Sequence, residues 1–261
     1  MTAPVEEIRA ELLTVVEGAI RNHPRSLQTR IGPSEIGDPC ARKIAYKLAG
    51  APVVNGEDRT PWKPTVGTAV HSWLQDTLMH ANTTLPDYDA TGGRYWCEVR
   101  VDVGEILGQP ITGSCDLRYD NISLDYKIVG DDQLRKYKTE GPGPQYRVQG
   151  HLYGRGWARR GQPVDYVAVW FLPRNQELRQ NHLWVEPYDE QIAIDALTRV
   201  EGIAKLVQAL GAAAAAMLPP TENWCVFCPF FRPGSKDLTA GCPGVIDATV
   251  PSPSLASLIA K

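Results

Sequence analysis

Three consecutive apolar segments between residues 95 and 129 constrain the fold of this chain most. They cover residues 95–103, 110–120 and 121–129. Their residue types and alternation are those of β-strands, and an Asp-Asn step joins the last two as in a hairpin. Asp116 lies in the second segment, and Asp125 and Lys127 lie in the third. Charged side chains are rarely buried without partners, and a bound divalent metal ion would supply one.

Helical periodicity surrounds these strands. Helices are expected over residues 5–21, 41–49, 66–81, 144–161 and 189–217, and further strands over 164–172 and 181–188. The order of elements is therefore helices, three strands, a helix and further strands, which indicates an α/β chain. At 261 residues the chain can bury one large core. We expect one domain over residues 1–261.

Composition excludes several classes of protein. The hydrophobic fraction of 43% and the charged fraction of 22% are ordinary for a globular protein, and we expect no apolar run that approaches the roughly 20 residues needed to span a bilayer. The N-terminal stretch is acidic and lacks a secretory signal. We therefore expect a cytoplasmic protein with no membrane contact. A net charge of −3 gives no global basic field, so nucleic-acid binding would depend on local basic patches.

The Asp-Tyr-Lys triplet has the arrangement of a hydrolytic site. Alternation puts Asp125 and Lys127 on one face of a strand, and Asp116 can join them across the hairpin. Two carboxylates can hold Mg²⁺ or Mn²⁺, which activates a water molecule and screens a phosphate, while a lysine orients that water and stabilises developing charge. This is the chemistry of phosphodiester hydrolysis. The alternative is a surface strand with an ordinary ion pair.

Two helices add residues to this group. His71 lies on the helix before the strands and could complete the coordination of a metal, although a lone helical histidine is also common on surfaces and in cores. Gln149 and Tyr153 are four residues apart on the following helix and therefore share a face. Glu98, on the first strand, is a candidate accessory acid, for which we expect a structural or surface role.

Taken together, these residues resemble the RecB-like branch of the PD-(D/E)XK nuclease superfamily. The motifs occur in the family's order: GTAVHSWL resembles the helical motif with a metal-ligand histidine, GSCDLRY the Gly-x-x-Asp motif, LDYK the Asp-x-Lys motif and QGHLY the Gln-x-x-x-Tyr motif. The resemblance implies a restriction-endonuclease-like core in which helices flank a mixed central sheet. Its catalytic part would cover residues 65–187.

The resemblance also implies roles for single residues. The ligands of Mg²⁺ or Mn²⁺ would be His71, Asp116, Asp125 and the Tyr126 carbonyl. Lys127 would be catalytic together with the two aspartates, and Gln149 and Tyr153 would organise the site or touch DNA. Gln145 precedes Gln149 by one helical turn, so the glutamine assignment could shift to it; Tyr153 favours Gln149.

Four of the six cysteines form a pattern of their own. Cys225, Cys228 and Cys242 lie in a segment rich in Pro, Gly and aromatic residues, and Cys40 precedes a helix far away in sequence. Without an export signal, disulfides are not expected. Four thiolates can hold zinc or an iron–sulfur cluster, and spacing alone leaves both open. Cys97 and Cys115 lie in strand patterns and are expected to be small buried hydrophobic residues.

One N-terminal and three C-terminal cysteines around a RecB-like nuclease resemble the iron–sulfur exonucleases of the CRISPR-associated Cas-four type and the AddB nuclease domain. The resemblance implies a 4Fe-4S cluster in a cap formed by residues 30–50 and 218–245, with a mobile tail over 246–261. The cap would line a passage for DNA. Its candidate DNA-binding residues, with one from the core, are Arg42, Lys43, Tyr153 and Arg232. Trp224, Phe227 and Phe230 could stack on bases, although packing around the cluster is the alternative.

The sequence therefore predicts a metal-dependent DNA exonuclease that acts on single strands or free ends. The expected settings are phage recombination, in the host cytoplasm, or CRISPR-type adaptation, each with its own partner proteins; we favour a phage-encoded enzyme. Two alternatives remain: a non-catalytic DNA-binding scaffold subunit with the same fold and cluster, and a nuclease stapled by zinc. The sequence leaves the oligomeric state open.

Overall fold

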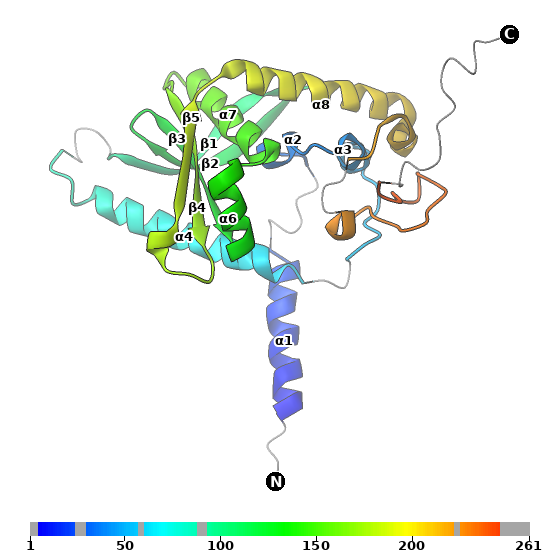
Figure 1. Ribbon diagram of the computed structural model, residues 1–261, viewed down its shortest axis with the longest axis horizontal. Coiled ribbons are helices and arrows are strands. Elements are labelled where there is room, and N and C mark those ends of the chain that lie inside the picture. Colours follow the sequence, from blue (N-terminus) through cyan, green and yellow to red (C-terminus); the bar gives the residue numbers. More distant parts are fainter. Residues whose placement is uncertain (1–4, 24–29, 57–59, 88–92, 222–224, 246–261) are drawn as a thin grey trace.

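A computed structural model describes residues 5–23, 30–56, 60–87, 93–221 and 225–245. Its described residues contain a five-stranded sheet in the order β1-β2-β3-β4-β5 (Figure 1). The strands are β1 (Tyr95–Ile106), β2 (Gln109–Tyr119), β3 (Ile122–Val129), β4 (Tyr166–Pro173) and β5 (His182–Pro187). Only the β3–β4 pair is parallel among these neighbours, and the others are antiparallel. The expected α/β chain with a mixed sheet is confirmed.

Helices account for most of the remaining described chain. They are α1 (Val5–Arg21), α2 (Pro33–Ile36), α3 (Ala41–Leu48), α4 (Trp62–Asn82), α6 (Asp131–Glu140), α7 (Pro144–Arg159) and α8 (Glu190–Leu210), with 3₁₀ turns at Leu178–Gln180, Gly211–Met217 and Cys225–Phe227. The helix expected over 189–217 ends early, because Gly211 adopts a φ of 58° and the chain continues as a 3₁₀ turn. Helix α6 was not predicted, since its sequence reads only as a basic patch.

The sheet is covered on both faces. On one face, α7 and α8 pack over β1 around Trp157, Leu152 and Val200. Helix α7 can approach β1 closely because it carries Gly156, where a Cβ would lie 2.5 Å from the Val101 side chain. On the other face, α4 packs Leu74 into a second cluster. Helices α4 and α7, which lie on opposite faces of the sheet, can therefore both reach the place where β2 and β3 meet.

One helical segment, Glu190–Met217, is long and apolar enough by length and composition to cross a membrane. This corrects the expectation that no stretch of the chain reaches that length. A core helix passes the same test, so the finding is weak evidence for a membrane. Helix α8 buries Ala193, Val200 and Ile203 among its core residues.

The segment around α3 and the C-terminal part of the described chain meet beside the sheet. Helix α3 lies next to the segment around residues 211–245 (Figure 1), and Tyr46 packs with Ala215, Phe230 and Cys242. The Asn55 side chain also donates to the Cys228 carbonyl oxygen at 2.9 Å. Residues 30–50 and 218–245 are thus neighbours in space. Trp224 and the tail over 246–261 lie outside the described residues.

Candidate active site

The predicted acidic residues lie where β2 and β3 separate. The pairing of these strands runs from Tyr119–Ile122 to Leu117–Leu124, and Asp116 and Asp125 follow that last pair. Beyond that pair, the Asp116 side chain takes the place of a backbone acceptor for Tyr126. Its Oδ2 accepts a hydrogen bond from the Tyr126 amide at 2.8 Å. Asp116 is 5% exposed and Asp125 is 2% exposed. The two buried carboxylates therefore lie at the point where these two strands separate.

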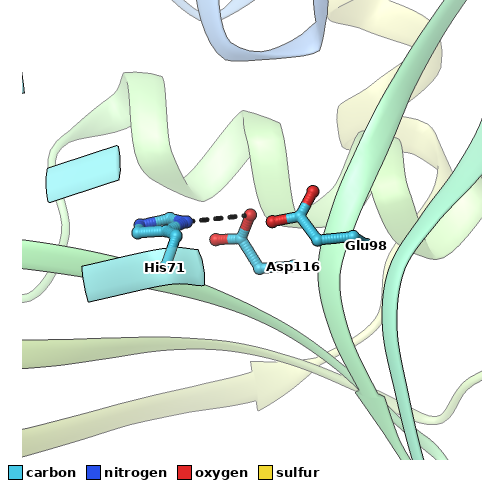
Figure 2. A group of neighbouring side chains, drawn as sticks. All are labelled: His71, Glu98 and Asp116. Carbon is cyan, nitrogen blue, oxygen red and sulfur yellow. Dashed lines mark ion pairs between the residues drawn. The ribbon is translucent and has the colours of Figure 1, made fainter. Parts of the chain in front are cut away.

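His71 reaches this point from α4. Its Nδ1 lies 3.4 Å from Asp116 Oδ1 (Figure 2). Its ring meets the Tyr126 ring edge-on, with the centroids 5.4 Å apart. The Tyr126 side chain is buried in the cluster under α4, so it helps to fix the position of His71. The structure therefore brings together His71, Asp116 and residue 126, which come from three different elements.

Glu98 joins the group unexpectedly. One ligand atom each from His71, Glu98 and Asp116 lie within 4.8 Å of one another, and Figure 2 shows the Glu98 carboxylate beside that of Asp116. Glu98 has a φ of 52°, which for a residue other than glycine costs about 1 kcal/mol. This position agrees with the alternative of an accessory acid, and the role of Glu98 remains a prediction. The sequence identified Glu98 only as a candidate accessory acid, because an acid in an alternating strand is unremarkable and no local pattern places it beside His71 and Asp116.

Asp125 and Lys127 form the other half of the site. The Lys127 ammonium makes an ion pair with Asp125 Oδ2. Gln149 of α7 donates from Nε2 to Asp125 Oδ1 at 2.7 Å, so each carboxylate oxygen has its own partner. Lys127 Nζ also lies 4.9 Å from the centroid of the Tyr146 ring, where a cation–π attraction adds to its hold.

The choice between the two glutamines is resolved by their contacts. Gln145 donates to the Ser34 carbonyl oxygen at 2.6 Å, away from the carboxylates, whereas Gln149 contacts Asp125. Tyr153 lies one turn beyond Gln149 and is 6% exposed. It can support the site from within the core, but its burial contradicts the prediction that it contacts DNA directly.

Close packing around Gly113 explains why the first position of the GSCD motif is a glycine. A Cβ there would lie 2.8 Å from the Pro33 side chain and 3.2 Å from the Tyr153 hydroxyl. Only a residue without a side chain lets β2 pass between α2 and Tyr153. The glycine therefore helps to set the position of Asp116 three residues later.

The two aspartates have different proton affinities. Burial, together with the charge of Asp116, raises the pKa of Asp125 to about 7, although Lys127 opposes this change. Burial also acts to raise the pKa of Asp116, but the combined effect of His71, Lys127 and the Tyr126 amide outweighs it and lowers that pKa. Burial acts to lower the pKa of His71, whereas Asp116 and Asp125 raise it overall. Asp116 is thus ionised at neutral pH, while Asp125 is partly protonated.

The donor set fits a divalent cation. Carboxylate oxygens suit Mg²⁺ and Mn²⁺, and an imidazole nitrogen is a common ligand of transition metals such as Mn²⁺. His71, Glu98 and Asp116 have the necessary proximity. Asp125 adds a buried carboxylate whose ionised form a nearby cation would stabilise. The individual roles predicted for these residues remain predictions.

Four cysteines line a second, separate cavity. Cys40, Cys225, Cys228 and Cys242 surround it together with Lys43 and Tyr46, and none of the four forms a disulfide. Short backbone hydrogen bonds shape the C-terminal part, where the Cys242 amide donates to the Phe230 carbonyl and its own carbonyl accepts from Arg232, both at 2.7 Å. The four cysteines predicted to act together thus line one cavity, and a zinc ion or an iron–sulfur cluster at these thiols remains a prediction.

The other two cysteines lie away from this cavity. Cys115 is fully buried in the main core, as expected. Cys97 is only half-buried and packs at the edge of the cluster under α4.

The basic residues of the predicted cap differ from one another. Arg42 is 7% exposed and donates to the carbonyl oxygens of Ala215 and Leu218 at 3.0 and 2.9 Å. The prediction that it binds DNA is therefore wrong, since its donors hold the two cap segments together. Lys43 pairs with Asp38 at 2.6 Å beside the cysteine cavity. Arg232 is exposed and remains a candidate for DNA contact.

The two described aromatic residues near the cysteines also differ. Phe230 is buried against Tyr46, with the ring centroids 5.2 Å apart, so it packs the cap. Phe227 is 68% exposed.

Comparison with known proteins gave low similarity. No protein-family model and no curated protein matches the sequence. Among solved structures, the alkaline exonuclease LHK-Exo from Laribacter hongkongensis aligns with a TM-score of 0.44 and 14% identity over 69% of this chain and 89% of that one. A phage related exonuclease from Haemophilus somnus aligns with a TM-score of 0.38 and 14% identity over 72% of this chain and 94% of that one. Likeness at this level does not identify an activity.

Proposed function

We propose that this chain is a metal-dependent DNA exonuclease of the RecB-like PD-(D/E)XK type. One observation carries the proposal: β2 and β3 separate around Asp116 and Asp125, with Lys127 on Asp125 and His71 on Asp116. Two buried carboxylates, a lysine and an imidazole in contact form a costly arrangement for a purely structural role, because each buried charge loses its hydration. Hydrolysis of a phosphodiester uses all four groups.

The residues that would hold Mg²⁺ or Mn²⁺ are His71, Asp116 and Asp125, with the Tyr126 carbonyl and with Glu98 beside them. A bound cation supplies Lewis acidity, a counter-charge for the phosphate and a lower pKa for water.

The protein's own side chains prepare the remaining chemistry. Gln149 fixes Asp125 through Oδ1, which leaves Oδ2 for Lys127. The Lys127 ammonium then lies where it can orient an attacking water molecule and stabilise the negative charge that develops on the phosphate. Burial keeps bulk water from screening these charges.

The first experiment is cleavage of end-labelled single-stranded and double-stranded DNA with Mg²⁺ or Mn²⁺, with and without a chelator. Wild type should release label in a metal-dependent reaction, and Lys127→Ala should not. Lys136→Ala is the matched control, because Lys136 is an exposed lysine on α6 whose ion pair is with Glu140 and not with the buried carboxylates. Equal activity of Lys127→Ala and wild type would contradict the proposal. An inactive, fully folded wild type would favour the scaffold alternative.

We propose that the cysteine cavity holds a 4Fe-4S cluster. Support comes from the four free thiols that line it and from two cationic side chains nearby: Lys43 lines the cavity, and Arg42 Nη1 lies 3.7 Å from Cys242 Sγ. Positive charge next to thiolates offsets the net negative charge of such a cluster. Iron and zinc analysis of protein purified without oxygen, together with the visible absorption spectrum, distinguishes the two metals. Zinc without iron would select the zinc-stapled nuclease.

The substrate and the setting of the reaction are proposals from the sequence alone. We propose single-stranded DNA or DNA with free ends as the substrate, in phage recombination or CRISPR-type adaptation, and a cytoplasmic location. Digestion of circular against linear DNA tests the requirement for ends, because an exonuclease leaves the circle intact.

A further inference from the structure

Helix α1 carries a wide apolar face that the described chain leaves largely exposed. Figure 1 shows α1 projecting away from the sheet. Its apolar residues recur at positions 5, 8, 12, 15 and 19, the alternating three- and four-residue spacing of a helix–helix seam. Further apolar residues, Leu13, Val16 and Ile20, widen this face. Of the helix's residues only Ile20 is buried. Among the described residues, most of this face of the helix is therefore left uncovered.

The surface continues onto the start of α4. One groove is lined by residues of α1 together with Thr60 and Trp62, and a second runs from Trp62 to Trp73 along α4. The exposed fractions are 62% for Val5, 49% for Ile8, 60% for Leu12, 44% for Leu13, 42% for Val16, 59% for Trp62 and 61% for Trp73. We call these seven side chains the α1–α4 surface.

The area of the α1–α4 surface matches one side of a dimer. Taking roughly 60–120 Å² for a fully exposed aliphatic side chain and roughly 150–250 Å² for a tryptophan, the seven side chains expose on the order of 500 Å². A stable interface buries about 800 Å² per partner, of which roughly 60% is apolar. Contiguous apolar patches of this size are rare on monomers and mark interaction sites.

The charges of α1 favour a second copy of the chain over a lipid surface. The helix carries Glu6, Glu7, Glu11 and Glu17 against Arg9 and Arg21, whereas helices that bind anionic membranes have a basic polar face. In an antiparallel pair, the acidic first half of one α1 lies against the half of the other that ends at Arg21. A parallel pair would instead bring three glutamates of each copy together. The antiparallel pair also aligns the two helix dipoles favourably.

We propose that two copies of this chain associate through the α1–α4 surface, with the two α1 helices packed antiparallel across a two-fold axis. The same patch then serves both partners, as a symmetric dimer requires. Each α1 covers the apolar groove beside Trp62 of the other copy. This interface is separate from the candidate active site and does not depend on nuclease activity.

The test is the mass of the full chain in solution, measured by sedimentation or light scattering over a range of concentrations. The expected mass is twice the chain mass of 28.7 kDa. Leu12→Glu puts a carboxylate into the centre of the surface and should weaken dimerisation at least about 100-fold, because two charges would be buried without partners. Thr14→Glu adds the same charge to an exposed position on the polar side of α1 and should leave the dimer intact.

Three results would overturn the proposal. The first is a monomeric wild type at every concentration, and the second is a dimer that Leu12→Glu leaves unchanged. The third is a monomer that becomes a dimer only when residues 246–261 are deleted, since the tail would then be the natural occupant of the surface. Both substituted positions are exposed in the single chain, so each variant should fold. Helix content measured by circular dichroism checks this.

Discussion

The carboxylate site and the cysteine cavity are both candidate metal centres, but the fold builds them in different ways. The carboxylate site takes its residues from α4, β1, β2, β3 and α7, which are regular elements anchored in the two largest clusters of the core. The cysteine cavity takes its residues from segments at opposite ends of the chain. A small cluster around Tyr46 and a few hydrogen bonds hold those segments together in the protein itself.

The two sites should therefore depend on a bound metal in different ways. Hydrogen bonds from Tyr126 and Gln149 hold the carboxylates, so we expect the site to keep its form when no cation is bound. The cap has little apolar burial of its own, so a group that joins its four thiols would supply much of its stability. Loss of the first metal should therefore remove activity, and loss of the second should remove structure.

The largest expected effect is that of Lys127→Ala on activity. Removal of this ammonium should lower the cleavage rate by about 10³-fold or more, the usual contribution of a positioned catalytic group. The melting temperature should change little, because Asp125 can take up a proton when its counter-charge is lost. Single-turnover cleavage measures the first effect, and thermal unfolding of the same protein sample measures the second. A large fall in melting temperature with a matching fall in activity would remove the distinction between the two centres.

The opposite pattern is expected for Cys225→Ser. Loss of one thiolate should release the bound metal or cluster and lower the free energy of unfolding by roughly 3 kcal/mol, because a link across most of the chain disappears. Metal analysis and denaturant unfolding measure the two effects. Cys97→Ser is the matched control, since Cys97 lies outside the cavity. A Cys225 variant with its full metal content would contradict the assignment.

A smaller effect is expected for Glu98→Gln. The change keeps the size of the side chain but removes the charge next to His71 and Asp116, so the affinity for Mn²⁺ should fall roughly 10-fold to 100-fold. Calorimetric titration measures this without any turnover. Glu105→Gln alters an exposed glutamate on the same strand and should have no effect. If wild type and Glu98→Gln bind Mn²⁺ with equal affinity, Glu98 has a structural role and is not a metal ligand.

The smallest expected effect is the response of metal binding to pH. Asp125 has a pKa of about 7 in the folded chain, against an ordinary value of 3.8, so it gains a proton as the pH falls through 7. A cation must displace that proton, and its affinity should therefore decrease by up to about tenfold for each pH unit below 7. Mn²⁺ titrations at a series of pH values measure the slope. An affinity that does not change across this range would contradict the combination of a raised pKa and a ligand role for Asp125.

Much of the fold and several residues of the candidate site could be predicted from local sequence patterns. Period and residue type predict the strands, the flanking helices and the helical position of His71, because these signals are local. Spacing along one strand or one helix likewise groups Asp125 with Lys127 and Gln149 with Tyr153. The four cysteines could also be grouped, since their residue type and context are unusual.

The remaining features could not be predicted, because they depend on contacts between residues far apart in the sequence. Glu98 enters the site through a positive φ where β1 passes β2, which no pattern reports. Arg42 reads as a surface cation but turns inward, because carbonyl oxygens at residues 215 and 218 take its donors. The burial of Tyr153 depends in the same way on how closely α7 packs against the sheet. Local sequence fixes which residues carry the chemistry, whereas packing between distant segments decides which of them solvent, a metal or DNA can reach.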